Sequence, residues 1–399
     1  MIFKGMPELI DIGKFREKVL CRKMQYCEEN DLVFKGVGQI ELEIGEVLER
    51  VYEKHPDYPY VLVREEGDSS AERQKAELND GICSGKVNDC YYIFCPWGLP
   101  IAIGRFTGFI FRESLSEGQR KMMEEKGIKI PDYQKSIYEY PAFQRFKDCK
   151  VELSNYIHTL SVWFVSLHEF GHIINGHIDL MDDVRNGEVD ITKEQRKALE
   201  LHADMTAANL LTEVISSWQK YVGVMRREVH LNGTNPGITY CDEISFAALA
   251  AYLSLRCYLP DEDKKWDEYT IGLHLGNSAT HPLTQLRLAV VFNCLLDGLL
   301  EIAQTEEERG IFSKNFIDMV TQFEDFLFQN ENAEDREKLF YTPTELMRTE
   351  KGKEYFQGEF DALMELNDIL EKYTETLLKI EGEWIDYQTL PEKIFDVES

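Results

Sequence analysis

The residues best suited to chemistry lie in one apolar segment, VWFVSLHEFGH at positions 162–172. Its two histidines, His168 and His172, are four positions apart, and Glu169 directly follows the first. On a helix this spacing places both imidazoles one turn apart on the same face, where they can share one tetrahedral Zn²⁺. Glu169 then projects beside the metal, where it can accept a proton from water. The segment therefore predicts a zinc site with its own general base.

A third metal ligand is available 28 residues after the second histidine, in the segment ELHAD at positions 200–204. On the next predicted helix Glu200 and Asp204 share a face, so Glu200 can complete the coordination while Asp204 accepts the other ring N–H of His168. His202 points about 200° away from Glu200 around the helix. We therefore predict one Zn²⁺ per chain, held by Glu200 and the two histidines, and interpret His202 as a core or surface histidine.

These motifs resemble those of the gluzincin zinc peptidases, and three features are similar to the HtpX-like and CaaX prenyl protease type 1 branch. His177 follows the second histidine by five positions, the third-ligand helix reads E-x-x-A-D, and residues 280–287 read T-H-P-x-x-x-x-R. The resemblance covers about residues 160–290, and the chain lacks that branch's transmembrane helices. As a non-membrane zincin with its own N-terminal lobe, it also resembles, more weakly, the phage-exclusion protease Lit, whose family cleaves a host translation factor.

The resemblance implies a zinc-dependent metalloendopeptidase that hydrolyses peptide bonds in a protein substrate. Zinc would lower the pKa of a water molecule from about 15.7 towards 7, and Glu169 would accept its proton and later return it to the leaving amine. In this reading His281 donates to the developing oxyanion, Arg287 braces the site, and His177 is a structural or supporting residue rather than a ligand. The segment Thr280–Pro282 also fits an ordinary helix start, and both interpretations can hold together.

A second class of function stays open at this point. The chain could be a metal-binding regulatory protein, or an interaction protein of the toxin or phage-defence type, built on an inactive or latent zincin scaffold. Such a protein would hold its partner through the acidic C-terminal region and would tolerate the loss of the Glu169 carboxylate. The two classes therefore differ in what Glu169→Gln would do.

The elements that must position the site begin with a predicted sheet. Short β-branched or aromatic runs separated by turn signals occur in residues 1–150, at positions 60–63, 91–94, 101–103 and 109–111. They predict an N-terminal α+β lobe with a small antiparallel sheet and flanking helices. Because zincins commonly bind substrate as an added strand along a sheet edge, we expect Leu99–Phe111 to be that edge.

Helical periodicity dominates the rest of the chain. Residues 151–300 form the predicted zincin catalytic region, with helices expected at 154–175, 193–218, 243–258 and 283–303. Residues 301–399 hold 26 acidic and 10 basic side chains, a net charge of −16. We predict a helical hairpin with an acidic outer face there, or alternatively a docking surface for a basic protein partner. The expected fold class is thus α+β, with a zincin-like metallopeptidase core.

Composition excludes several other classes of function. The net charge of −28 over 399 residues would repel phosphate backbones and anionic membrane surfaces, so we expect no nucleic acid partner. The chain has no apolar run of about 18 residues, so we expect no membrane span, and we read Ile244–Leu259 as a buried helix. The nine cysteines contain no C-x-x-C pair and are expected to be reduced thiols. These features predict a soluble, cytoplasmic protein whose partner is a protein or peptide substrate.

Overall fold

The protein is described here from a computed structural model. It describes residues 24–26, 60–65, 83–87, 90–95, 98–112, 135–217, 238–258, 284–330 and 350–374. This part of the chain is mainly helical with one small sheet, which confirms the α+β fold class. The helical elements are α4 (Gly98–Thr107), η2 (Gly108–Arg112), η3 (Ile137–Glu139), α6 (Pro141–Gln144), η4 (Lys147–Cys149), α7 (Lys150–Ile174), α8 (His177–Asn186), α9 (Lys193–Ser217), α11 (Tyr240–Tyr258), α13 (Thr284–Glu301), α14 (Glu306–Asn330) and α17 (Glu350–Leu370).

The sheet has four strands in the order β1-β2-β4-β3. They are β1 (Met24–Tyr26), β2 (Tyr60–Glu65), β3 (Cys83–Val87) and β4 (Cys90–Cys95). The β1–β2 and β3–β4 pairs are antiparallel as predicted, whereas β2 and β4 run parallel, with Leu62 opposite Ile93. The predicted strands at 60–63 and 91–94 are confirmed. The sheet is therefore mixed, and β3 forms one of its edges.

The prediction of strands at 101–103 and 109–111 is wrong, because both runs are helical, in α4 and η2. Leu99–Phe111 is consequently not a sheet edge. Ile103, Ile110 and Phe111 are all buried in the core, and both elements pack against α7. A short apolar run buried on several sides has no period-two alternation, so its sequence does not separate a buried helix from a buried strand.

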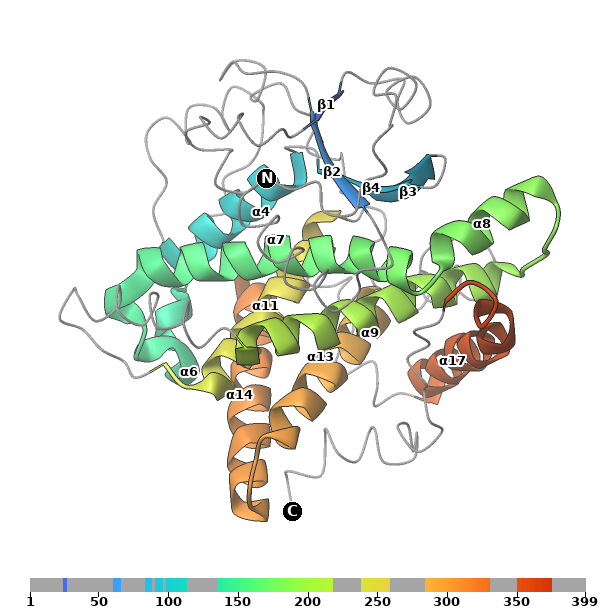
Figure 1. Cartoon of the computed structure of the whole chain (residues 1–399). Helices are drawn as coiled ribbons and strands as arrows, with labels where there is room; N and C mark the ends of the chain where they lie inside the picture. Colours follow the sequence, from blue (N-terminus) through green and yellow to red (C-terminus); the bar gives the residue numbers. More distant parts are fainter. Residues whose placement is uncertain are drawn as a thin grey trace.

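Helix α7 is the central element of the structure. Figure 1 shows it between the sheet and the helices α9, α11 and α13, and α7 packs closely on α9 and α11. Its apolar side chains, such as Leu160, Phe164 and Leu167, are buried, as expected for a helix covered on several faces. Gly171 lets α9 come close, because a Cβ at this position would lie 3.2 Å from the Ala203 carbonyl oxygen. The predicted helices at 154–175, 193–218, 243–258 and 283–303 are confirmed to within a few residues.

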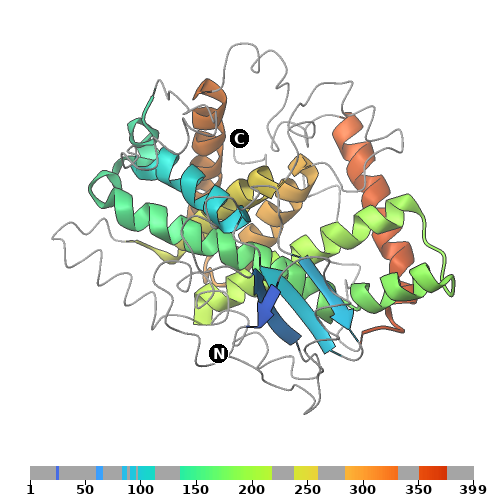
Figure 2. The ribbon, with the colours of Figure 1, turned by 90° about the horizontal axis from the view of Figure 1, so that it is seen from above.

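The two C-terminal helices do not form the predicted hairpin. Helix α14 packs on α11 and α13, whereas α17 packs on α9, and Figures 1 and 2 place them on different sides of the molecule. Each has its own apolar face, with Phe323 and Phe326 buried on α14 and Leu363 and Leu366 buried on α17. One continuous core therefore joins all three predicted regions. Their division into domains stays a prediction.

Helix ends beside the site are defined by specific backbone and side-chain contacts. Gly176 separates α7 from α8 with φ +72°, and Gly187 ends α8 with φ +76°, conformations that favour glycine. Helix α9 begins with a capping box, in which Thr192 and Gln195 each accept the other's backbone N–H through a side-chain oxygen. After α17, Thr374 donates from Oγ1 to the Ile174 carbonyl oxygen at 2.7 Å, so the end of the described chain docks on the α7–α8 turn.

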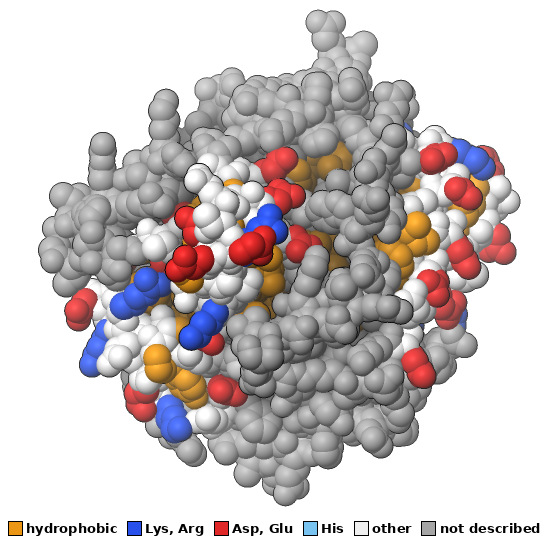
Figure 3. Space-filling view, turned by 90° about the horizontal axis from the view of Figure 1, so that it is seen from below, with side chains coloured by type: hydrophobic (Ala, Val, Ile, Leu, Met, Phe, Trp, Pro, Cys, Tyr) orange, Lys and Arg blue, Asp and Glu red, His pale blue; other side chains and the backbone are white. Residues whose placement is uncertain are grey.

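The surface of the described residues carries acidic and basic side chains. Within the described residues, no helix combines the length and the apolar character that crossing a bilayer requires. Figure 3 shows acidic side chains on both sides of one face, with Lys and Arg side chains among them. Among the described residues, Cys149, Cys241 and Cys294 are buried free thiols.

The α7–α8 turn gives a first prediction. Gly176→Ala should lower the free energy of unfolding by about 2–5 kcal/mol. Alanine is unfavourable at the positive φ of this residue, and its Cβ would overlap Tyr373, whose backbone oxygen would be 2.8 Å away. Gly187→Ala is the matched control, since it has the same φ region and nothing within 4 Å of the added Cβ, and should cost about 1–2 kcal/mol. Urea denaturation of both variants measures the difference. Equal losses would show that the Tyr373 contact contributes nothing.

Candidate metal centre

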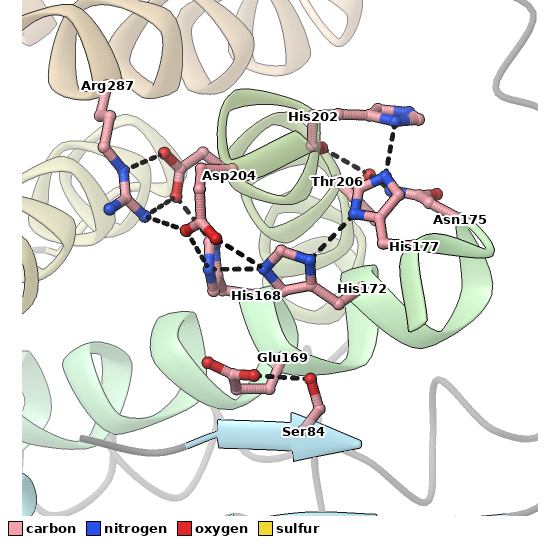
Figure 4. A network of polar contacts seen from close by, with 11 residues as sticks. Ser84, His168, Glu169, His172, Asn175, His177, His202, Asp204, Thr206 and Arg287 are labelled. Atoms are coloured by element: carbon pink, nitrogen blue, oxygen red, sulfur yellow. Dashed lines mark hydrogen bonds and ion pairs between the residues drawn. The ribbon is translucent and has the colours of Figure 1, made fainter. Parts of the chain in front are cut away.

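Three helices bring the predicted site residues together. Helix α7 carries His168, Glu169 and His172, α9 carries Glu200 and Asp204, and α13 carries Arg287. In Figure 4 the His168 and His172 rings lie next to each other, with Asp204 and Arg287 beyond His168. The remaining predicted residue, His281, lies outside the described residues. The sequence spacing and the packing of α7 on α9 thus place the two predicted motifs at one point.

The three predicted ligands fit a tetrahedral metal. Their ligating atoms all lie within 4.8 Å of one another. The two Nε2 atoms of His168 and His172 are 3.2 Å apart; that of His168 lies 3.5 Å from Oε2 of Glu200, and that of His172 lies 3.6 Å from Oε1 of the same carboxylate. Ligands bound to zinc at about 2.0–2.1 Å in a tetrahedron are about 3.3–3.5 Å apart. The donor set and its spacing therefore suit Zn²⁺ without rearrangement of the helices.

A buried ion-pair chain holds the first histidine. The Nδ1 atom of His168 is 2.9 Å from Oδ1 of Asp204, which is completely buried. Arg287 forms a bidentate pair with the same carboxylate, donating from Nε to Oδ2 at 2.6 Å and from Nη2 to Oδ1 at 2.9 Å. The Nη2 atom also lies 3.7 Å from Oε2 of Glu200. A carboxylate bound to the outer nitrogen of a ligating histidine orients the ring and raises its basicity.

These charges favour a cation between the ligands. Burial lowers the pKa of His168, but the hydrogen bonds and charges of Asp204 and Glu200 outweigh this effect and raise it to about 10. Burial raises the pKa of Glu200, but His172, His168 and Arg287 hold it well below 4.5. The pKa of Asp204 is likewise lowered, because Arg287 and His168 outweigh its burial. The two carboxylates that raise the pKa of His168 would also favour a metal cation beside the ring.

Glu169 has a partner that the sequence did not indicate. Ser84 of β3 donates from Oγ to Oε2 of Glu169 at 2.7 Å, as Figure 4 shows. Burial raises the pKa of Glu169 to about 7, against the opposing effects of His168 and Ser84. Asp179 of α8 fixes β3 and β4 nearby, because it accepts hydrogen bonds from Lys86 at 2.7 Å and from the Tyr91 hydroxyl at 2.5 Å. The short segment CSGKV has no motif, and only the tertiary structure reveals this contact.

Two further histidines form a row of contacts that starts at His172, the second predicted ligand. Nδ1 of His172 is 2.9 Å from Nδ1 of His177, and Nε2 of His177 is 3.1 Å from Nδ1 of His202. His177 and His202 are each only 1% exposed. Burial lowers the pKa of His172 and of His202 to about 4, and burial together with the neighbouring histidines lowers the pKa of His177 well below 6.5. His202 is therefore a buried histidine of α9 that contacts His177 of α8.

The Arg287–Asp204 pair yields a second prediction. Arg287→Met should lower the free energy of unfolding by about 3–5 kcal/mol, because it leaves a buried carboxylate without its bidentate partner. Arg287→Lys should recover only part of this loss, since an ammonium group cannot bind both oxygens in the same way.

Arg185→Met is the matched control for this change. Arg185 pairs with Asp182 on the surface of α8, its side chain is 70% exposed, and its loss should alter stability by no more than about 0.5 kcal/mol. Guanidinium or urea unfolding of the variants measures both effects. The same denaturation midpoint for Arg287→Met and Arg185→Met would contradict the structural role of Arg287.

Comparison with known proteins supports one broad class of function. The model of the family described as Peptidase U49 matches residues 113–296, somewhat less than half of the chain. Neither the curated proteins nor the solved structures give a match. The matched range contains both histidines of the H-E-x-x-H motif and the E-x-x-A-D segment, whereas Ser84 lies outside it. The match thus supports a peptidase, and the residues that it covers include all three of the candidate metal ligands.

Proposed function

We propose that this protein is a zinc-dependent metalloendopeptidase of the gluzincin type. The observation that carries the proposal is the spacing of the three side chains: the two histidine Nε2 atoms are 3.2 Å apart, and each lies 3.5 or 3.6 Å from a different carboxylate oxygen of Glu200. The peptidase family match supports the reaction class. The E-x-x-A-D segment, His177 and the T-H-P-x-x-x-x-R segment favour the HtpX-like and CaaX prenyl protease type 1 branch.

The residues of the chain have distinct roles in this proposal. His168, His172 and Glu200 would hold one Zn²⁺, which supplies Lewis acidity and lowers the pKa of a water molecule from about 15.7 towards 7. Glu169 is 6% exposed and accepts the proton of the attacking water, then returns it to the leaving amine. Asp204 keeps the His168 ring oriented. His281 is proposed to donate a hydrogen bond to the developing oxyanion, a contribution that commonly amounts to ~10²–10³ in turnover.

Strand β3 is the proposed docking edge for the substrate. It lies at the edge of the described sheet and contacts α7, and its Ser84 touches Glu169. An extended peptide that added to this edge would run past the general base, with main-chain hydrogen bonds providing affinity. The proposed partner is therefore a protein or peptide with an extended segment. An additional basic protein partner at the acidic C-terminal region stays a prediction.

Zinc analysis tests the metal site directly. Elemental analysis of untagged protein should find about one zinc per chain in the wild type and in Glu169→Gln, and much less in Glu200→Ala, which lacks one of three protein ligands. Absence of zinc from all three proteins after incubation with zinc would refute the metal site. The interaction-protein alternative would then become the better explanation.

Proteolysis tests the enzyme. A peptide library prepared from a bacterial or eukaryotic lysate is incubated with wild type and with Glu169→Gln, and new termini are identified by mass spectrometry. Wild type should generate a defined set of cleavages, and Glu169→Gln should lower their rate by at least ~10²–10⁴, because the general base is lost while the metal stays bound. Equal cleavage by both proteins would show that Glu169 is not the base.

Removing the Ser84 hydroxyl tests the position of β3. Ser84→Ala should leave the zinc content unchanged and lower kcat about tenfold on the cleaved peptide, because one hydrogen bond that orients the Glu169 carboxylate is lost. Ser161→Ala is the control, since Ser161 is a buried serine of α7 whose hydroxyl donates only to the Ile157 carbonyl oxygen. Unchanged kcat in Ser84→Ala would remove β3 from the proposed machinery.

A further inference from the structure

The two candidate histidine ligands have different partners on their outer nitrogens. His168 contacts the carboxylate of Asp204 through Nδ1, whereas the Nδ1 atom of His172 contacts another imidazole, that of His177, at 2.9 Å. Metal-bound histidines usually donate this N–H to a carboxylate, a backbone carbonyl or water. The contact with His177 is therefore chemically distinct and requires its own explanation.

Hydrogen-bond rules determine how the rings must be protonated if His172 binds a metal. A ligating Nε2 carries a lone pair, so the proton of the neutral His172 ring is on Nδ1, and Nδ1 of His177 must accept it. The proton of His177 is then on Nε2, which donates to Nδ1 of His202 at 3.1 Å. The proton of His202 is consequently on Nε2. The opposite order would place a proton on Nε2 of His172, where it would block the metal.

The surroundings hold His177 in a position suited to this order. It is the first residue of α8, directly after Gly176, whose turn is covered by Tyr373. On the other side, Thr206 accepts from Asn175 at 2.8 Å and donates to the His202 carbonyl oxygen at 2.9 Å, which ties the α7–α8 turn to α9. Figure 4 shows His172, His177 and His202 in sequence, leading away from His168. Both ends of the row are thus fixed by packing.

We infer that His177 is a positioning residue for the metal ligand His172, and that His202 in turn fixes the tautomer of His177. This inference rests on the proposed function, because it assigns the two histidines to the same zinc site. They act through His172 and do not bind the metal. Their effect is to keep the proton of His172 on Nδ1 and its Nε2 lone pair directed at the zinc position.

Zinc affinity tests the role of His177. Competition with a chromophoric chelator should show that His177→Phe binds zinc about 10–100-fold more weakly than wild type, because the Nδ1–H of His172 loses its acceptor. His177→Asn should recover most of the affinity, since its amide oxygen can occupy the place of Nδ1 and accept the same proton. His158→Phe is the matched control, because this partly buried histidine of α7 lies ten residues before His168 and its Nε2 contacts the Pro100 carbonyl oxygen at 3.0 Å; the variant should bind zinc like wild type.

His202 provides a test of the order of the row. His202→Phe should weaken zinc binding less than His177→Phe does. The double variant should bind no more weakly than His177→Phe alone, because His202 acts only through His177. Additive losses would show that His202 affects the metal by another route and would overturn its assigned role.

Spectroscopy of the wild type measures the protonation of the three histidines directly, whether or not the variants fold. Long-range ¹H–¹⁵N spectra of the zinc-loaded, histidine-labelled protein should find His172 protonated at Nδ1, and His177 and His202 each protonated at Nε2. A proton on Nδ1 of His177, or a doubly protonated His177, would overturn the inference even though zinc is bound. A wild type that binds no zinc would instead overturn the proposed function together with this inference, so the two failures are distinguishable.

Discussion

The buried contact between Arg287, Asp204 and His168 is the interaction on which the rest of the site depends. It joins α13, α9 and α7 through alternating positive and negative groups in an environment closed to solvent. Isolated, each of these groups would be costly to bury, whereas together they neutralise one another. The three helices can therefore pack through their apolar faces only in the arrangement that keeps these groups in contact. The same arrangement sets Glu200 and the imidazoles at metal-binding distances.

The candidate site contains two kinds of support for its histidines. The outer nitrogen of His168 contacts the carboxylate of Asp204, whereas the outer nitrogen of His172 contacts the imidazole of His177. A charged acceptor makes a ligand more basic, and a neutral acceptor mainly fixes its direction. The two candidate ligands thus have unequal surroundings, although they come from successive turns of one helix. Glu169 lies between the two histidines in sequence, and its carboxylate contacts Ser84 of β3.

The parts of the structure that sequence could predict are those that depend on short-range periodicity. The spacing of His168 and His172, and of Glu200 and Asp204, follows from one helical turn, and the helices that carry them were predicted within a few residues. The prediction of a sheet edge at Leu99–Phe111 is wrong because a short apolar run without an alternating pattern does not separate a helix from a strand. The contact of Ser84 with Glu169 could not be predicted, because the two residues are 85 positions apart and no local pattern connects them. The C-terminal helices were recognised, but their separate packing sites depend on the shape of a core that local patterns do not describe.

The docking of Thr374 on Ile174 has a consequence for the order in which the protein is made. These residues are 200 positions apart, so the ribosome synthesises the H-E-x-x-H segment long before the segment that packs on the turn behind it. Chains fold from the N-terminus during synthesis, and contacts of such long range form last. The nascent chain therefore carries His168, Glu169 and His172 while about 200 further residues are added, before the contact behind the α7–α8 turn can form. The turn behind His172 therefore reaches its final packing later than the helices α7 and α9, which carry the candidate ligands.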